Sequence, residues 1–212
     1  IGYLYAYDYK KKIVIWAKNY KIPFRSNLKI YKDKIILANQ NNNLLFIDKS
    51  SGEILKKIPT EETLVKNDFE NNLSLNTNSV FFLNTYGSLY AIDNERMRIN
   101  WFLNLNRSID INPSNLFSGK QIISNGKIIV ISTEDNTYII NANSGSIIFK
   151  KEFLSKLKPL IIENYLFIVT KNNFLVCMDL KTGNLIYSYD INQKIANFTK
   201  TKKKEIILKD II

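Results

Sequence analysis

Gly87-Ser88-Leu89-Tyr90-Ala91-Ile92-Asp93 is the stretch that decides the fold, because related copies of it recur along the chain. Each copy has polar or small turn residues, then large apolar residues, then an Asp or Asn. The five copies end at Asp8, Asp48, Asp93, Asn141 and Asp179. Successive copies are 40, 45, 48 and 38 residues apart, a period typical of stacked units such as four-stranded propeller blades. The repeat therefore predicts about five such units.

The last repeat is the clearest, and it shows four short apolar runs separated by polar turns. These runs are 159–162, 165–170, 174–178 and 184–189. Their β-branched and aromatic residues indicate strands, and the short turns between them indicate an antiparallel meander. A lone sheet of this kind cannot bury its faces, whereas sheets stacked about an axis can. We therefore predict an all-β propeller of four-stranded antiparallel blades, with residues 1–212 as a single domain.

A pattern of Asp or Asn, two residues, Ser or Thr, and Gly follows three of the copies and predicts a turn. The side-chain oxygen of the first residue accepts hydrogen bonds from backbone N–H groups two or three residues further on. The Gly takes a positive φ that most residues avoid. Gly52, Gly145 and Gly183 fit the pattern, but Lys12 and Met97 stand in this place elsewhere, so we expect those turns to be strained or of another type. Calcium binding is the alternative role of the acidic residues, but they lie one per blade, which favours the structural role.

A second marker stands eight residues after each Asp or Asn. The markers are Trp16, Lys56, Trp101, Phe149 and Tyr187. A large aromatic residue repeated at the end of a fourth strand favours packing between adjacent blades. Stacking on bases or sugars is the functional alternative. Lys56 departs from the pattern.

The positive charge of the chain raises the question of an anionic partner. The 212 residues carry a formal net charge of +11, which by itself is typical of proteins that bind nucleic acid or anionic surfaces. The lysines are scattered, however, and Lys, Asn and Ile are common throughout the sequence. We interpret the charge as biased composition and expect no nucleic acid partner.

Several kinds of functional site lack the residues they need. The sequence has no histidine, which excludes Ser-His-Asp and Cys-His nucleophile systems and removes the commonest transition-metal ligand. Its seven glycines form no phosphate-binding loop, and its single cysteine, Cys177, excludes an internal disulfide. No apolar run approaches the roughly 20 residues of a membrane helix. We expect no catalytic, cofactor-binding or metal-binding residues and no cofactor.

Gly87 to Asp93, followed by Trp101, resembles the PQQ-like propeller repeat, and the likeness extends over essentially the whole chain. That family has two relevant branches. One comprises periplasmic quinoprotein dehydrogenases, which use pyrroloquinoline quinone and a metal, and which typically carry a vicinal Cys-Cys disulfide. The other comprises catalytically inert scaffolds similar to BamB, a lipoprotein of the outer-membrane β-barrel assembly machinery. Residues 21–27 resemble the entry to a blade in BamB-like proteins, and one cysteine cannot form the disulfide of the dehydrogenases.

The resemblance implies a non-enzymatic scaffold, a BamB-like subunit of outer-membrane β-barrel protein assembly. Such a protein is periplasmic and associated with the outer membrane, with the assembly machinery as its protein partner. A remnant or relative of a PQQ-dependent quinoprotein dehydrogenase is the alternative.

Three connectors between repeats are candidates for contact with a protein partner, because binding residues concentrate in long loops on a rigid scaffold. Residues 59–72 are polar and include the pair Glu61-Glu62, which we interpret as solvated charge. Residues 104–120 mix charged and apolar side chains, as interfaces do. The candidate residues are Arg107, Asp110, Leu116 and Phe117, with Lys156 and Lys158 from the connector at 153–158. Alternatively, Ile109, Leu116 and Phe117 form the inner strand of the next blade.

The two ends of the sequence leave the closure of the propeller open. The chain begins at Ile1 with the third strand of a blade, and residues 204–209 resemble a second strand. The ends could meet in a five-bladed ring, or the chain could be part of a ring of about eight blades. The second arrangement leaves blade edges open to self-association. We expect any link to the membrane to be peripheral, through an N-terminal anchor that precedes Ile1.

Overall fold

The computed structural model describes residues 1–62, 71–106, 122–133 and 136–199. Within these residues, eighteen strands form five antiparallel sheets, numbered here as blades 1 to 5. Blade 1 consists of β1 (Tyr3–Asp8) and β2 (Ile13–Asn19). Blade 2 consists of β3 (Lys29–Tyr31), β4 (Lys34–Ala38), β5 (Leu44–Asp48) and β6 (Ile54–Ile58). Blade 3 consists of β7 (Asn72–Leu75), β8 (Ser79–Leu83), β9 (Ser88–Asp93) and β10 (Ile99–Asn104).

The last two blades repeat this plan. Blade 4 consists of β11 (Ile123–Ser124), β12 (Ile128–Ser132), β13 (Thr137–Asn141) and β14 (Ile147–Lys151). Blade 5 consists of β15 (Leu160–Ile162), β16 (Tyr165–Val169), β17 (Phe174–Asp179) and β18 (Leu185–Asp190). The prediction of four-stranded antiparallel blades is confirmed, and blade 1 contributes a third and a fourth strand, as the sequence indicated.

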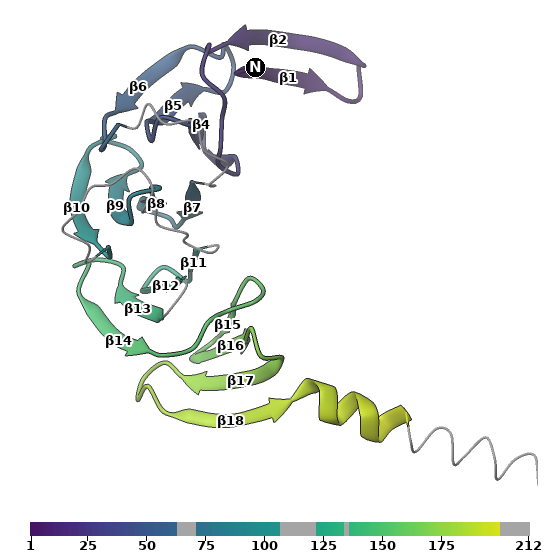
Figure 1. Ribbon diagram of the computed structural model, residues 1–212. Helices are drawn as coiled ribbons and strands as arrows, with labels where there is room; N and C mark the ends of the chain where they lie inside the picture. Colours follow the sequence, from purple (N-terminus) through teal and green to yellow (C-terminus); the bar gives the residue numbers. More distant parts are fainter. Residues whose placement is uncertain (63–70, 107–121, 134–135, 200–212) are drawn as a thin grey trace, which may run out of the picture.

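The blades follow one another along an open arc (Figure 1). The short first strands of successive blades contact each other on the inside of the arc, and the fourth strands lie on its outside. Blade 1 and blade 5 lie at opposite ends and are far apart, so the described residues do not close into a five-bladed ring.

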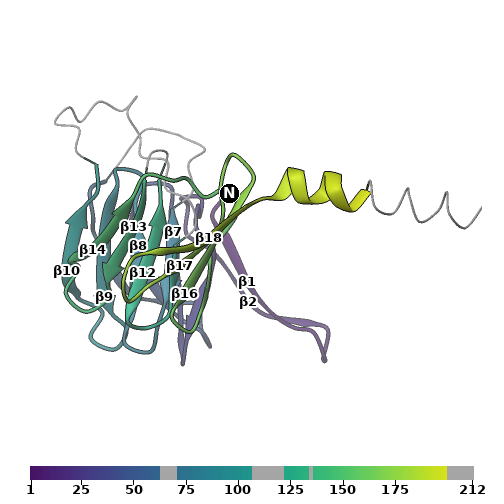
Figure 2. The ribbon, with the colours of Figure 1, turned by 90° about the horizontal axis from the view of Figure 1, so that it is seen from below.

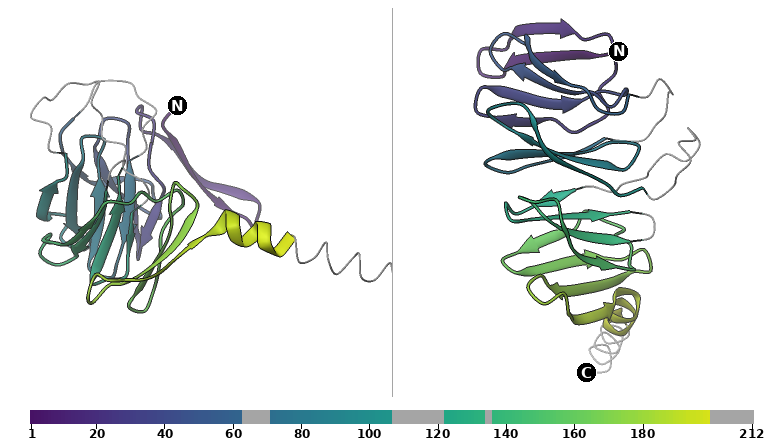
Figure 3. Two further views of the ribbon diagram at one scale, coloured as in Figure 1. Left: turned by 60° about the horizontal axis from the view of Figure 1, so that its bottom comes forward. Right: turned by 90° about the vertical axis from the view of Figure 1, so that its left-hand side faces the viewer.

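Four hydrophobic clusters form the core, one at each contact between neighbouring blades. Alternation along each strand explains this arrangement. In β9, Leu89 and Ala91 pack against blade 4, whereas Tyr90 and Ile92 pack against blade 2. Figure 3 shows the sheets following one another face to face. An inner blade is therefore buried on both faces, whereas each end blade has one exposed face.

The turns between third and fourth strands have the hydrogen bonds expected of the Asp or Asn markers. Asp48 Oδ1 accepts from the backbone N–H groups of Ser50 at 2.9 Å and Ser51 at 2.7 Å. Hydrogen bonds to the Asp48 carboxylate, the strongest from the Ser50 hydroxyl and the next from the Ser51 N–H, lower the pKa of Asp48 to about 2. In the other repeats, equivalent side-chain oxygens accept similar bonds from backbone N–H groups; they belong to Asp8, Asp93, Asn141 and Asp179.

A helix at 191–199 follows β18, and the sequence patterns did not predict it. Asp190 caps its first turn by accepting from the backbone N–H groups of Asn192 at 2.9 Å and Gln193 at 3.2 Å. Figure 2 shows the helix projecting away from the blades. Its apolar residues Ile195 and Phe198 are exposed. No helix in the described part of the chain is long and apolar enough to cross a membrane.

Candidate functional site

The described parts of the connectors between blades lie beside the turns between second and third strands at one edge of the arc, which we call the connector edge. Its described segments include connector residues 59–62 and 152–159, and turn residues 39–43, 84–87 and 170–173. Backbone hydrogen bonds hold a connector to its turn, for example from Lys171 N to Leu154 O at 3.2 Å and from Lys156 N to Val169 O at 2.7 Å. The connector edge therefore presents loops of the blade 2–3 and blade 4–5 junctions side by side with the turns of the blades.

Four of the predicted partner-binding residues, Arg107, Asp110, Leu116 and Phe117, lie outside the described residues, as does Ile109. The described inner strand of blade 4 is β11, which begins later, at Ile123. Lys156 lies exposed on the connector edge, and its Nζ donates to Asn173 Oδ1 at 2.9 Å. Lys158 is also exposed. The pKa of Lys29 is lowered mainly by the burial of Lys29 and to a smaller extent by the positive charge of Lys158.

Glu61 is exposed, as interpreted, but its carboxylate is not a free solvated charge, because it joins blade 3 to the connector that leaves blade 2. Three side chains of blade 3 donate to it. They are Asn84 Nδ2 at 2.6 Å, Ser88 Oγ at 2.8 Å and Tyr90 OH at 2.7 Å. Burial raises the pKa of Glu61, but these hydrogen bonds outweigh burial and leave the pKa below its ordinary value. Glu62 is exposed and its carboxylate pairs with Lys57 Nζ at 3.1 Å.

Blade 5 lacks this polar contact at the corresponding place. Asn84, Ser88 and Tyr90 precede the turn residue Asp93 by nine, five and three residues. At the same distances before Asp179, blade 5 has Thr170, Phe174 and Val176. The connector differs in the same way, because Leu154 stands three residues after the end of β14, as Glu61 stands three residues after the end of β6. Apolar side chains therefore replace the carboxylate and two of its three donors, and the polar Thr170 replaces the third.

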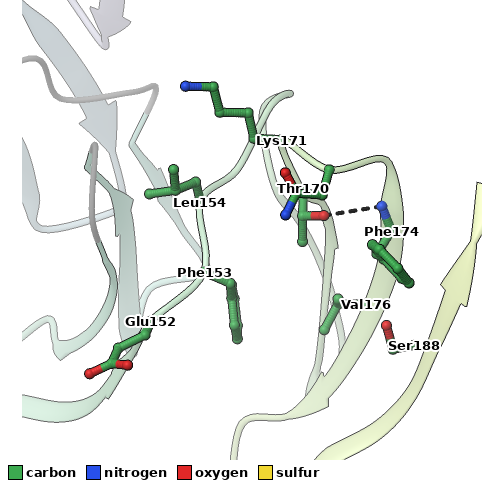
Figure 4. Close-up of a pocket in the computed structure, with 9 residues that line it drawn as sticks. Glu152, Phe153, Leu154, Thr170, Lys171, Phe174, Val176 and Ser188 are labelled. Carbon is green, nitrogen blue, oxygen red and sulfur yellow. Dashed lines mark hydrogen bonds between the residues drawn. The ribbon is translucent and has the colours of Figure 1, made fainter.

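A groove of about 570 Å³ opens between the connector from blade 4 and the strands of blade 5 (Figure 4). Phe153, Leu154, Phe174 and Val176 supply its apolar lining. Thr170, Ser188, Lys171, Asn172 and Glu152 supply its polar groups. Its volume lies in the range of about 300–1,000 Å³ that ligand pockets have. We call it the blade 4–5 groove.

The lining of the blade 4–5 groove has two charged side chains, Glu152 and Lys171. The one carboxylate in its lining is Glu152, and Thr170 Oγ1 is occupied as acceptor of the Phe174 N–H at 3.0 Å. No group of three or more His, Cys, Asp or Glu residues that could hold a metal ion occurs within the described ranges. Sequence analysis singled out Lys156 beside the groove but missed its lining. Aligning the repeats with one another, residue by residue, would have revealed Val176 and Leu154 as departures.

Comparisons with known proteins are consistent with this geometry. Residues 2–151 match the family described as outer membrane protein assembly factor BamB. The crystal structure of BamB from Moraxella catarrhalis has a TM-score of 0.71 at 14% identity, over 89% of this chain and 58% of that chain. The computationally designed Ika8 protein gives 0.66 at 10% identity, over 89% and 56%. Quinohemoprotein alcohol dehydrogenase from Comamonas testosteroni gives 0.64 at 13% identity, over 89% and 40%.

These identities show the fold alone, and this chain spans little more than half the length of the BamB structure. None of the curated protein sequences matches significantly. The fold prediction is confirmed as an all-β arrangement of four-stranded antiparallel blades that matches propellers, and the resemblance to PQQ-like repeats is confirmed by the family match.

Proposed function

Since this chain belongs to the family of the outer membrane protein assembly factor BamB, we propose that it is a non-enzymatic scaffold in the assembly of outer-membrane β-barrel proteins. In this role it works in the periplasm, associated with the outer membrane, and binds a protein of the assembly machinery. The observation that carries the proposal is the family match over residues 2–151, together with connectors gathered on one edge of a rigid arc.

A scaffold of this kind works by holding its binding loops in place before the partner arrives. Loops that are already ordered lose less conformational entropy on binding, so more of the contact energy remains as affinity. At the connector edge the Glu61 carboxylate and the backbone bonds of residues 154 and 156 supply that order. Lys156 and Lys158, together with Arg107, Asp110, Leu116 and Phe117, are the residues we propose for the partner contact.

Binding to the periplasmic part of the β-barrel assembly machinery tests this function. We expect saturable binding by biolayer interferometry, weakened at least about fivefold by the double change Lys156→Glu and Lys158→Glu. The matched control, Lys10→Glu with Lys11→Glu, reverses two charges on the β1–β2 turn and should leave binding unchanged. Absence of binding by the wild-type protein would overturn the proposal.

A relationship to quinoprotein dehydrogenases is the second candidate, favoured by the structural match to quinohemoprotein alcohol dehydrogenase. Titration with pyrroloquinoline quinone and calcium, followed by isothermal calorimetry, separates the two. The scaffold proposal expects no saturable heat of binding, and a stoichiometric complex would favour the dehydrogenase relationship.

A further inference from the structure

We propose that the blade 4–5 groove binds an aromatic side chain of a partner protein, in a segment that carries a carboxylate next to the aromatic residue. The inference rests on the proposed scaffold function and names the chemistry of the segment that the scaffold takes. The chain itself shows this chemistry, because it fills the corresponding place between blades 2 and 3 with an aromatic ring and a carboxylate.

The filled place is built around Tyr90. Its ring stacks on Phe82 at 6.2 Å and on Phe102 at 6.0 Å between ring centroids. Its hydroxyl donates to Glu61, whose carboxylate also binds Asn84 and Ser88. One aromatic side chain and one acidic side chain therefore occupy this position together, and both come from the chain.

The same place in blade 5 has lost both groups. Val176 stands where Tyr90 stands, and Ser188 pairs with Val176 as Phe102 pairs with Tyr90. Leu154 stands where Glu61 stands. Two aromatic rings and a carboxylate are thus replaced by three smaller or apolar side chains, all of which line the blade 4–5 groove. At the place of Ser88, blade 5 instead has a ring, Phe174, which lines the groove as well.

The remaining walls suit an aromatic ring. Phe153 and Phe174 point into the groove from opposite sides, and Val176 lies between them (Figure 4). Edge-to-face or offset contacts with two rings stabilise a third aromatic ring beyond what the burial of its area contributes. Thr170 retains the turn-stabilising role of Asn84, since its Oγ1 accepts from Phe174 N, and its hydroxyl can donate toward a ligand carboxylate.

The charges at the rim favour an acidic neighbour for the aromatic residue. Lys171 extends from the rim at one end of the groove, and Glu152 lies at the other end (Figure 4). Lys156 is held on the same turn by its bond to Asn173. A carboxylate beside the ligand ring would thus lie near Lys171 and Lys156. At the corresponding end of the junction between blades 2 and 3, the Glu61 carboxylate binds its donors.

A labelled peptide tests the inference. The probe is a fluorescein-tagged peptide with one Trp between Asp and Glu, titrated with the full chain and followed by fluorescence anisotropy. Two control peptides replace the Trp with Ala or the two acids with Asn and Gln. We expect saturable binding of the probe, at least tenfold weaker binding of the Ala peptide, and several-fold weaker binding of the neutral peptide.

Filling the groove should abolish this binding. The double change Val176→Tyr and Ser188→Phe restores the pair that blade 3 carries, and we expect at least a tenfold loss of affinity. Ile186→Tyr adds a ring at an exposed position of the same strand, outside the groove lining, and should change affinity less than twofold. Lys171→Glu, a surface change that does not threaten folding, should weaken the acidic probe but not the neutral peptide.

Equal binding of all three peptides, or full affinity in both the filled variant and Lys171→Glu, would overturn the inference. Binding of the apolar dye 1-anilinonaphthalene-8-sulfonate without binding of the peptide would also overturn it, in favour of a small apolar ligand. If the wild-type chain binds the assembly machinery but not the peptide, the groove inference fails and the scaffold function stands. If the wild-type chain binds the peptide but not the assembly machinery, the groove inference stands and the scaffold function fails.

Discussion

A Cβ atom on Gly145 would lie 2.6 Å from Cε3 of Trp101, which explains why this turn needs glycine. The same contact joins Gly52 to Trp16 and Gly183 to Phe149. The aromatic marker of one blade therefore packs on the turn glycine of the next blade, and Trp101 Nε1 also donates to the carbonyl of Ala142 at 3.1 Å.

This pairing accounts for the residues that departed from the sequence pattern. Met97 replaces the glycine in the turn that follows Lys56, the one blade marker that is not aromatic. Lys12 lies in blade 1, which no described blade precedes. Both residues keep a positive φ, 57° for Lys12 and 51° for Met97, so the turns are of the same type and strained. Where no ring packs on the turn, a side chain is tolerated.

Gly145→Ala should destabilise the fold by about 2–4 kcal/mol. A left-handed φ costs a residue with a Cβ about 1 kcal/mol, and forcing a methyl group against Trp101 adds about 1–3 kcal/mol. Lys12→Gly should have the opposite sign and stabilise the fold by up to about 1 kcal/mol, because it relieves φ strain and loses no buried contact. Urea unfolding at neutral pH measures both. Equal effects of the two changes would contradict the pairing.

Glu95 links blades 2 and 3 through charge, and its contribution should depend on pH. The hydrogen bond from Lys32, followed by the bond from Tyr31, lowers the pKa of Glu95 from 4.5 to about 2. A carboxyl whose pKa is lower in the folded state stabilises that state above its unfolded pKa, and the stabilisation is lost as pH falls from 4.5 toward 2. Wild type should therefore be more stable than Glu95→Gln at pH 7, and the difference should vanish near pH 2.

Denaturant titrations of wild type, Glu95→Gln and Lys32→Met at pH 7, 4 and 2.5 measure this dependence. Lys32→Met is the matched change, because it removes the donor that lowers the pKa most. Its pH profile should resemble that of Glu95→Gln. A constant gap between wild type and Glu95→Gln across these pH values would show that Glu95 does not couple the blades through its charge.

The connector after β6 holds the next blade through the hydrogen bonds of Glu61. Glu61→Ala leaves Asn84, Ser88 and Tyr90 without their shared acceptor, and unmade hydrogen bonds of part-buried groups cost about 1–3 kcal/mol. We expect a loss of this size in urea unfolding. Glu62→Ala, which removes an exposed pair with Lys57, should change stability by less than about 0.5 kcal/mol. If Glu61→Ala lost as little stability as Glu62→Ala, the hydrogen bonds of Glu61 would not hold the two blades together.

The strands could be predicted from sequence because alternation and turn chemistry are local signals. The predicted runs 165–170 and 174–178 correspond closely to β16 (Tyr165–Val169) and β17 (Phe174–Asp179). Glu61 could not be placed, since its partners lie more than 20 residues away and adjoin it only after two blades stack. The blade 4–5 groove was missed for a similar reason. Val176 indicates a missing aromatic ring only when blade 5 is aligned with blade 3, where Tyr90 holds the same position. The helix at 191–199 was missed because it follows a strand and its apolar face lies exposed.

The arc as a whole should be most stable in its middle. The clusters that join blades 2 to 3 and 3 to 4 contain the largest fully buried side chains, including Phe81, Phe82 and Phe46. Each blade contacts only its neighbours, so an end blade can open without the others. In hydrogen exchange we expect the amides of β8, β9 and β12 to exchange at least about tenfold more slowly than those of β1 and β2. Uniform protection would instead indicate that residues 1–212 unfold as a single cooperative domain.

We propose that the edge of blade 1 that is open among the described residues pairs with a second copy of the chain. Within the described residues β1 pairs with β2 alone, whereas β5, β9, β13 and β17 each lie between two strands. Tyr3, Tyr5 and Tyr7 are 53%, 60% and 56% exposed on one face of β1. An open edge of this kind is a template for pairing with another strand. Antiparallel pairing of β1 with β1 of a second copy would make a sheet of four strands, the number that the other blades have.

We expect the purified chain to form a dimer as its concentration rises, measured by size-exclusion chromatography with light scattering. Tyr5 lies at the centre of β1, so Tyr5→Lys would set two like charges opposite each other in the paired sheet and should raise the dissociation constant at least about fivefold. Tyr9→Lys, in the turn beyond the strand, keeps the new charge away from the pairing and should leave the dimer intact. A monomer at every concentration, or a dimer equally sensitive to both changes, would mean that this edge does not join two copies.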